Sequence, residues 1–152
     1  MNTVFLSSDH AGFALRARVA RHLAARNQSF EDCGPPDATP TDYPDEARKV
    51  AERVRATPQA RGILVCGSGV GMAIAANKVE GIRAVDAWNP DVARISRQHN
   101  DTNVLCLGER FLTEDQALAI VDAWLETGFD GGRHALRVAK IAALESPESR
   151  TA

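Results

Sequence analysis

The chain has 152 residues and a formal charge of −2, which fits one globular domain of ordinary size. General nucleic-acid-binding proteins usually carry a basic face, so a near-neutral charge predicts no nucleic acid partner. Three cysteines without a C-x-x-C pair indicate neither a disulfide framework nor a zinc ribbon. The first residues lack a signal-peptide pattern and no apolar run approaches the ~20 residues of a membrane span, so we predict a cytoplasmic protein.

Short apolar runs alternate with amphipathic stretches along the whole chain. Leu15, Val19 and Leu23, for example, recur at the spacing of one helix face, whereas Gly62–Cys66 is a short apolar run that predicts a buried strand. Thr113 with Gln116 is typical of a helix capping box. The predicted strands are Thr3–Leu6, Ser29–Asp32, Gly62–Cys66, Ile82–Val85 and Val104–Leu107. The predicted helices begin near Leu15, Pro44, Gly71, Asn89, Thr113 and Gly132.

Five strands that alternate with helices predict an α/β fold, a three-layer α/β/α Rossmann-like sandwich with a five-stranded parallel sheet. No internal repeat or long linker divides the chain, so we expect one domain over residues 1–145 and a flexible tail at 146–152. Ligands of such folds bind beyond the carboxyl ends of the strands, which is where polar residues collect in this sequence.

The turn Cys66-Gly67-Ser68-Gly69-Val70-Gly71 follows the clearest strand. Its three alternating glycines allow the backbone to curl and direct N–H groups inward, and the helix behind it adds a favourable dipole for an anion. Met72 stands where the dinucleotide fingerprint requires glycine, so the turn is not that motif. An anion cradle and a purely structural glycine turn both remain open from this motif alone.

Cys66 lies directly before the glycine turn, where a helix N-terminus favours a thiolate. It is therefore a candidate base or nucleophile, with a small buried side chain at a strand end as the alternative. Asp9 and His10 follow the first strand and should open onto the same sheet edge as Cys66, unless they are a cap and a surface histidine.

His99 closes the fourth predicted helix, where it can interact with the helix dipole or shuttle protons. Arg133 and Arg137 share one face at the start of the last helix, which suits a phosphate monoester and also an ordinary basic surface. A thiolate candidate, an oxyanion cradle, histidines and an arginine pair together predict proton abstraction next to a carbonyl. The sequence pattern indicates no metal and no cofactor.

These motifs resemble those of the ribose/galactose isomerase family from about residue 3 to residue 145. The R-Q-H-N-D segment and the C-G-S-G-V-G turn are the most specific of them. The matching segments are Ser8–Gly12, Thr41–Pro44, Cys66–Gly71, Ile74–Lys78, Gly81–Ala84, Ser96–Asp101, Val121–Leu125, and Gly131–His134 with Arg137.

The resemblance implies that Cys66 moves a proton between the C1 and C2 carbons of a sugar phosphate, through an enediolate. It implies that His99 opens the furanose ring. Ser68 and the backbone of the turn, including Gly67, Gly69 and Gly71, would hold the enediolate oxygens. The other implied contacts are with the sugar, from Asp9, Tyr43 and Asn100, and with its phosphate, from His10, Arg110, Arg133 and Arg137.

The resemblance also implies a homodimer or homotetramer with active sites shared between subunits. Cys66, with Met72 six residues later, fits the family branch that uses a cysteine base rather than a glutamate. Ribose 5-phosphate and ribulose 5-phosphate are the expected substrate pair, although the polar, bulky segment Asp86-Ala87-Trp88 keeps an allose, galactose or tetrose phosphate open. A nucleotide-binding module would leave the R-Q-H-N-D segment without a role, and a silent paralogue conflicts with the complete catalytic set.

Overall fold

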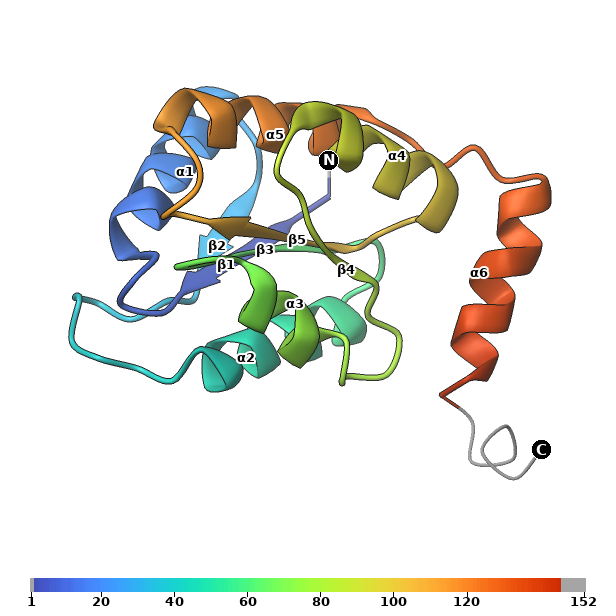
Figure 1. The fold of residues 1–152 in the computed structure, drawn as a ribbon, viewed down its shortest axis with the longest axis horizontal. Coiled ribbons are helices and arrows are strands. Elements are labelled where there is room, and N and C mark those ends of the chain that lie inside the picture. The colour runs from blue at the N-terminus through green and yellow to red at the C-terminus, as the bar shows by residue number, and fades with distance from the viewer. Residues whose placement is uncertain (1, 146–152) are drawn as a thin grey trace.

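The computed structural model describes residues 2–145, and the predicted tail at 146–152 lies outside them. All five strands are parallel and lie in the order β2-β1-β3-β5-β4, which confirms the predicted α/β class (Figure 1). The elements are β1 (Val4–Ser8), α1 (Phe13–Ala25), β2 (Phe30–Asp32), α2 (Tyr43–Ala56), β3 (Arg61–Cys66), α3 (Val70–Ala76), β4 (Ala84–Asp86), α4 (Pro90–Asn100), β5 (Val104–Gly108), α5 (Glu114–Glu126) and α6 (Arg133–Ala143).

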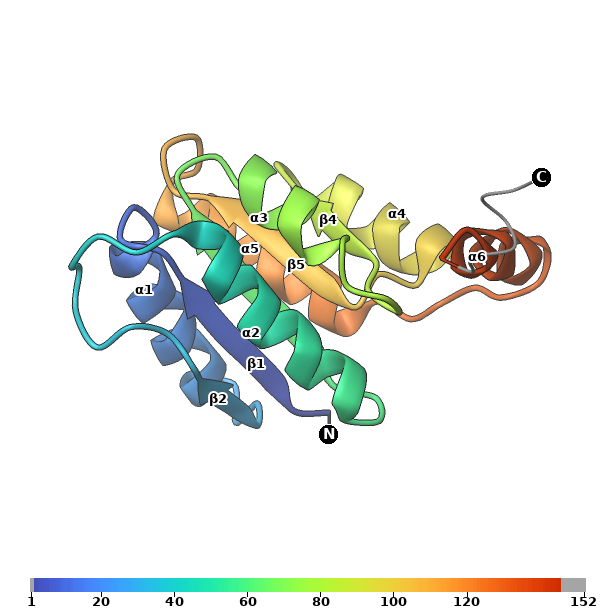
Figure 2. The same ribbon diagram turned by 90° about the horizontal axis from the view of Figure 1, so that it is seen from below.

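Hydrophobic layers cover both faces of the sheet. Helices α2 and α3 lie on one face, and α1, α4 and α5 lie on the other (Figures 1 and 2). The central strand β3 is buried on both sides, so its residues Ile63, Leu64 and Val65 are all apolar and fully inaccessible. This rigid centre fixes the carboxyl end of β3, where Cys66 lies.

The predicted helix starts agree with the observed caps. Thr113 and Gln116 form the reciprocal capping box of α5, and the Asn89 side chain accepts a hydrogen bond from the Val92 N–H at the start of α4. Asn27, predicted as a helix stop, has a φ of 55° just beyond the end of α1. These local signals therefore mark the starts of α4 and α5 and the end of α1.

Two strand boundaries differ from prediction by two residues, and the others differ by at most one. β1 continues through Ser7 and Ser8, which were predicted as loop, because Glu46 and Arg16 hydrogen-bond the two hydroxyls at 2.6 and 2.9 Å. β4 begins at Ala84 rather than Ile82, and the backbone N–H and C=O of Ala84 are both bound by the Asn77 side chain. Hydrogen bonds from side chains outside each strand thus accompany both boundaries.

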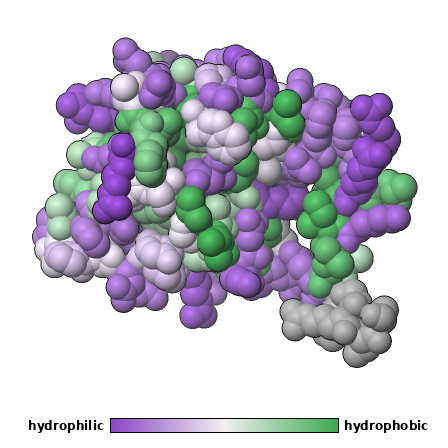
Figure 3. All heavy atoms as spheres, in the orientation of Figure 1, coloured by the Kyte–Doolittle hydropathy of each residue, from purple (hydrophilic) through white to green (hydrophobic). Residues whose placement is uncertain are grey.

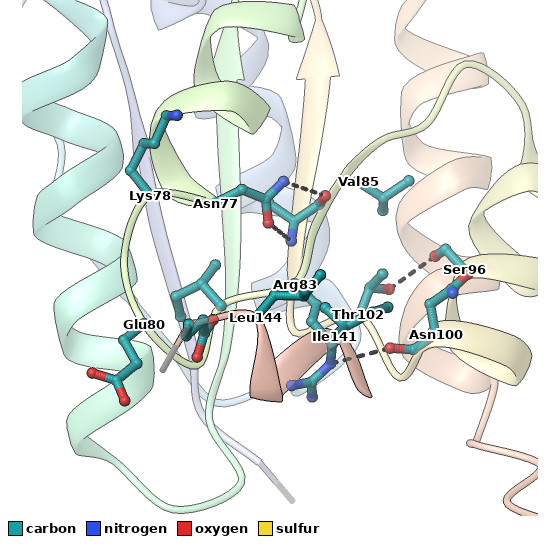
Figure 4. A pocket seen from close by; sticks show the side chains of 13 residues that line it. Asn77, Lys78, Glu80, Arg83, Val85, Ser96, Asn100, Thr102, Ile141 and Leu144 are labelled. Atoms are coloured by element: carbon teal, nitrogen blue, oxygen red, sulfur yellow. Dashed lines mark hydrogen bonds between the residues drawn. The ribbon is translucent and has the colours of Figure 1, made fainter. Parts of the chain in front are cut away.

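Helix α6 stands apart from the sheet and its covering helices (Figures 1 and 2). None of its residues is buried, and Leu136 and Ile141 on the helix and Leu144 at its C-cap are exposed. The space-filling view shows hydrophobic surface on this arm and over α3 (Figure 3). A cavity of about 720 Å³ separates Ile141 of α6 and its C-cap residue Leu144 from the body of the protein (Figure 4).

The helices of residues 2–145 include none that combines the length and the apolar character needed to cross a membrane.

Candidate active site

A cavity of about 400 Å³ lies at the carboxyl ends of β1 and β3. The chain places β2 on one side of β1 and the later strands on the other, so this is the topological switch point at which α/β sheets bind ligands. The cavity brings together eight of the residues predicted from the sequence, with Ala11, Val70 and Ile74 completing its wall. Those eight are Asp9, His10, Tyr43, Cys66, Gly67, Ser68, Gly71 and Arg110.

The three glycines of the turn each permit a close approach by a different side chain. A Cβ on Gly67 would lie 3.0 Å from the Arg110 guanidinium carbon, and one on Gly71 would lie 2.6 Å from the Tyr43 ring. Gly69 has a φ of 80°, which favours glycine, and a Cβ there would overlap the Asp86 carboxyl group. The alternating glycines therefore admit Arg110 and Tyr43 to the cavity wall.

The Cys66 side chain is 4% exposed, and the Gly69 N–H donates a hydrogen bond to its Sγ at 3.1 Å. This hydrogen bond fixes the position of the sulfur relative to the turn. Helix α3 has only seven residues, so the nearby amide is a more local source of stabilisation than the helix dipole invoked from the sequence. Gly69 itself does not line the cavity, unlike its neighbours in the turn.

Asp9 and His10 are held in place by backbone groups. Asp9 is buried and its Oδ1 accepts from the Gly12 N–H at 3.0 Å. His10 Nδ1 accepts from the Thr41 N–H at 3.2 Å, so the neutral ring carries its proton on Nε2. This tautomer keeps a donor available for an anion. Thr41 belongs to a motif that was recognised in the sequence, but its contact with His10 spans 31 residues and was not predicted.

A second group of predicted residues lies elsewhere in the chain: His99, Asn100, Arg133 and Arg137. None of them lines the Cys66 cavity. A crossover helix between two parallel strands runs back across the sheet, so α4 ends at the edge opposite the carboxyl ends of the strands. The predicted site residues therefore fall into two separate groups within one chain.

The ends of α4 and α6 are joined at this second location. The Asp130 N–H donates to the Gln98 carbonyl at 3.1 Å, and the His99 and His134 rings stack with centroids 4.2 Å apart. These contacts bring the start of α6, with Arg133 at its first position, beside His99. The fold thus gathers the second group into one surface of its own.

His99, Asp130 and His134 have potential metal-ligand atoms within 4.8 Å of one another, a cluster that the sequence pattern did not indicate. The two rings are almost parallel, at 10°, so their in-plane lone pairs do not converge on one point. Desolvation lowers the pKa of His134, and the nearby His99 and Arg133 lower it further. The observed ring arrangement is that of a stacked pair rather than of a coordination sphere.

Comparison with known proteins identifies relatives over almost the whole chain. The model of the family described as Ribose/Galactose Isomerase matches residues 4–141. Ribose-5-phosphate isomerase B of Escherichia coli K12 is 46% identical over 145 residues, which cover 95% of this chain and 97% of that protein.

Solved structures give the same picture. Ribose-5-phosphate isomerase B of Clostridium thermocellum superimposes with a TM-score of 0.92 at 48% identity, covering 94% of this chain and 97% of that one. The Mycoplasma genitalium protein, solved with bound ribulose-5-phosphate, has a TM-score of 0.90 at 40% identity, covering 94% and 95% of the two chains.

Proposed function

Because the chain belongs to the ribose/galactose isomerase family, we propose that it interconverts ribose 5-phosphate and ribulose 5-phosphate. The observation that carries this proposal is the Cys66 thiol, which lines a polar cavity at the switch point and receives a hydrogen bond from Gly69. Relatives with nearly the same length and fold carry the same enzyme name, and one of them was solved with the ketose product.

In the proposed reaction, the Cys66 thiolate removes the proton from C2 of the open-chain aldose. The electron pair of that C–H bond forms the C1–C2 double bond, and the carbonyl pair moves onto O1 to give an enediolate. Return of the proton to C1, with loss of the O2 proton to O1, produces the ketose. No electrons leave the substrate, so we infer that the reaction needs no redox cofactor.

The enediolate needs donors that are already in place when its charge develops. Ser68 and the backbone of Gly67 and Gly71 line the cavity beside Cys66 and are the donors we assign to this role. The Ser68 hydroxyl accepts from the Val70 N–H at 3.2 Å, which leaves its own proton available for donation to the substrate. The Gly69 amide is assigned to the thiolate instead.

Asp9 and Tyr43 line the same cavity and are assigned to the sugar hydroxyls. His10 and Arg110 are assigned to the phosphate, because Nε2–H and a guanidinium are both donors for phosphate oxygens. The cavity formed by one chain therefore contains neither the predicted ring-opening group, His99, nor the arginine pair, Arg133 and Arg137.

We infer that a second copy of the chain completes each site, with its α4–α6 surface placed over the Cys66 cavity. His99 would then open the furanose ring, Asn100 would contact the sugar, and Arg133 and Arg137 would bind the phosphate. Two features support this arrangement: α6 has no buried residue, and both α6 and α3 expose large apolar side chains. A two-fold dimer, alone or within a tetramer, would give two identical composite sites.

The proposal is tested by assaying the purified protein with ribose 5-phosphate, ribulose 5-phosphate and the phosphates of allose, galactose and a tetrose. We expect the highest kcat/KM for the pentose phosphates. Cys66→Ala should lower kcat by at least about 10²-fold and abolish deuterium uptake from solvent, because a positioned base contributes on that scale.

Cys33→Ala is the matched control, because Cys33 lies outside the cavity and should leave turnover unchanged. Near-normal turnover by Cys66→Ala would overturn the assignment of the base. A preference of more than about tenfold for another sugar phosphate would overturn the substrate.

A further inference from the structure

Asp86 is the last residue of β4, and its carboxyl group lies directly against the turn that follows Cys66. In the register of the sheet it stands beside Cys106 of β5. A Cβ on Gly69 would overlap Asp86 Oδ1, so the carboxyl group occupies the space that any larger residue at position 69 would need. In the sequence, Asp86 stands out as a polar residue next to the fourth predicted strand, but no role was predicted for its side chain.

Gly69 contacts two groups that are 20 residues apart in the chain. Its N–H donates to Cys66 Sγ at 3.1 Å, and its α-carbon side faces the Asp86 carboxyl group. One glycine therefore separates the proposed catalytic sulfur from an acidic side chain. Negative charges on the two sides of this glycine would disfavour each other, and the partly buried setting limits screening by solvent.

Few groups around Asp86 can stabilise its negative charge. It lines a cavity of about 220 Å³ whose wall is largely apolar and includes Trp88, Phe111 and Leu112. The hydrogen bonds and ion pairs among residues 2–145 include none to its side chain, and burial raises its pKa to about 6. It is therefore mostly ionised at neutral pH and lacks a cationic partner in the described part of the chain.

The other titratable groups around Asp86 come from the elements packed against β4. The Cys106 thiol of β5 is fully buried, and burial raises its pKa, with Asp86 and then Cys66 adding to the effect. Helix α3 contributes no charged side chain over Val70–Ala76. Arg110 of the β5–α5 loop lines the Cys66 cavity rather than the Asp86 cavity. Asp9, His10, Tyr43 and Arg110 face Cys66 from the cavity, whereas Asp86 is the charged group on the Gly69 side of the turn.

We propose that Asp86 is a positioning residue of the proposed isomerase, whose negative charge behind Gly69 restrains ionisation of Cys66 and keeps its thiolate strongly basic. The proposal rests on the function proposed above. A more basic thiolate removes a carbon-bound proton more effectively, and a lower thiolate fraction exposes the sulfur less to oxidation. Asp86 acts only through Gly69 and Cys66 and does not contact the substrate.

The test measures the ionisation of Cys66 directly, without substrate. The rate of iodoacetamide labelling at Cys66 is followed from pH 6 to pH 10 by mass spectrometry of the peptide that contains it. Asp86→Asn should move the midpoint of labelling to lower pH by about 0.5 to 1 unit, which is the scale for losing a nearby like charge that is partly screened. Asp86→Glu retains the charge and should keep the midpoint near that of the parent.

Asp91→Asn is the matched control, because it makes the same charge change at an exposed position in the first turn of α4. Its labelling midpoint should equal that of the parent protein. A shift below about 0.2 unit for Asp86→Asn, or a shift to higher pH, would overturn the proposal, since loss of a nearby negative charge must favour the thiolate.

Activity provides an independent second readout. The acid limb of the kcat/KM profile should move to lower pH with the labelling midpoint, whereas a structural loss would lower the plateau without moving the limb. A protein inactive toward every sugar phosphate would refute the proposed function, but the labelling comparison would still decide the role of Asp86. The two failures are therefore distinguishable.

Discussion

The half-buried Asp86 carboxyl group predicts an unusual dependence of stability on pH. Burial raises its pKa from 3.8 to about 6. A raised pKa means that the folded protein holds this proton more tightly than the unfolded chain does, so its contribution to stability is complete below pH ~4 and is lost as the pH rises to about 6. Asp86→Asn keeps the shape of the side chain but cannot ionise, so it should not show this loss.

The shift of about two pH units corresponds to about 3 kcal/mol, and solvent exposure of the side chain reduces this to about 1 to 2 kcal/mol. At pH 7 the melting temperature of Asp86→Asn should therefore exceed that of the parent by about 3 to 6 °C for a domain of this size. Near pH 4 the two proteins should melt almost together. Melting is recorded at one protein concentration, because association would also change the melting temperature.

Asp91→Asn, with the same charge change on an exposed side chain, should shift the melting temperature little at either pH. The reasoning fails if Asp86→Asn is no more stable than the parent at pH 7. It also fails if the gain is as large at pH 4 as at pH 7, because the gain would then not arise from ionisation.

Three further predictions concern the site. Arg137→Ala should raise KM for a sugar phosphate far more than for the free sugar. Arg137→Lys should recover only part of the loss, because an ammonium group lacks the bidentate geometry of a guanidinium group. Equal effects of Arg137→Ala on both substrates would show that the residue is structural. Exhaustive chelation should leave kcat unchanged, whereas a loss restored only by a divalent cation would give the His99–Asp130–His134 cluster a catalytic metal. Gly69→Ala should lower kcat at least about tenfold, because a side chain at a φ of 80° is strained and would displace the Gly69 N–H from Cys66 Sγ. A normal kcat would show that this hydrogen bond is dispensable.

Much of the fold is predictable from the sequence because its signals are local. The apolar run before Cys66 and the capping box at Thr113 and Gln116 depend on residues within one turn or one strand. The position of the cavity can be predicted almost as directly from the sequence, since the carboxyl ends of neighbouring parallel strands must meet at one edge of the sheet. For this reason Asp9 and Cys66 were expected together and are observed together.

The remaining features depend on contacts between distant segments. Nothing near Asp86 in the sequence indicates that its carboxyl group lies against Gly69. The Thr41 N–H that fixes the His10 tautomer is likewise remote, because it lies 31 residues from that ring in the sequence. Helix α6 was predicted correctly as a helix, but amphipathic periodicity alone does not specify what its apolar face will contact.

The central claim is that each active site combines the Cys66 cavity of one chain with the α4–α6 surface of another. Cys66→Ala and His99→Ala are made as two separately inactive proteins and then co-expressed with different affinity tags. In a mixed dimer one site receives both lesions, and the other receives an intact Cys66 and an intact His99. Random pairing makes about half of the dimers mixed, so about a quarter of the parental activity should return. No recovery in mixed dimers verified by mass spectrometry would contradict the shared site, because sites contained within single chains would each still carry a lesion.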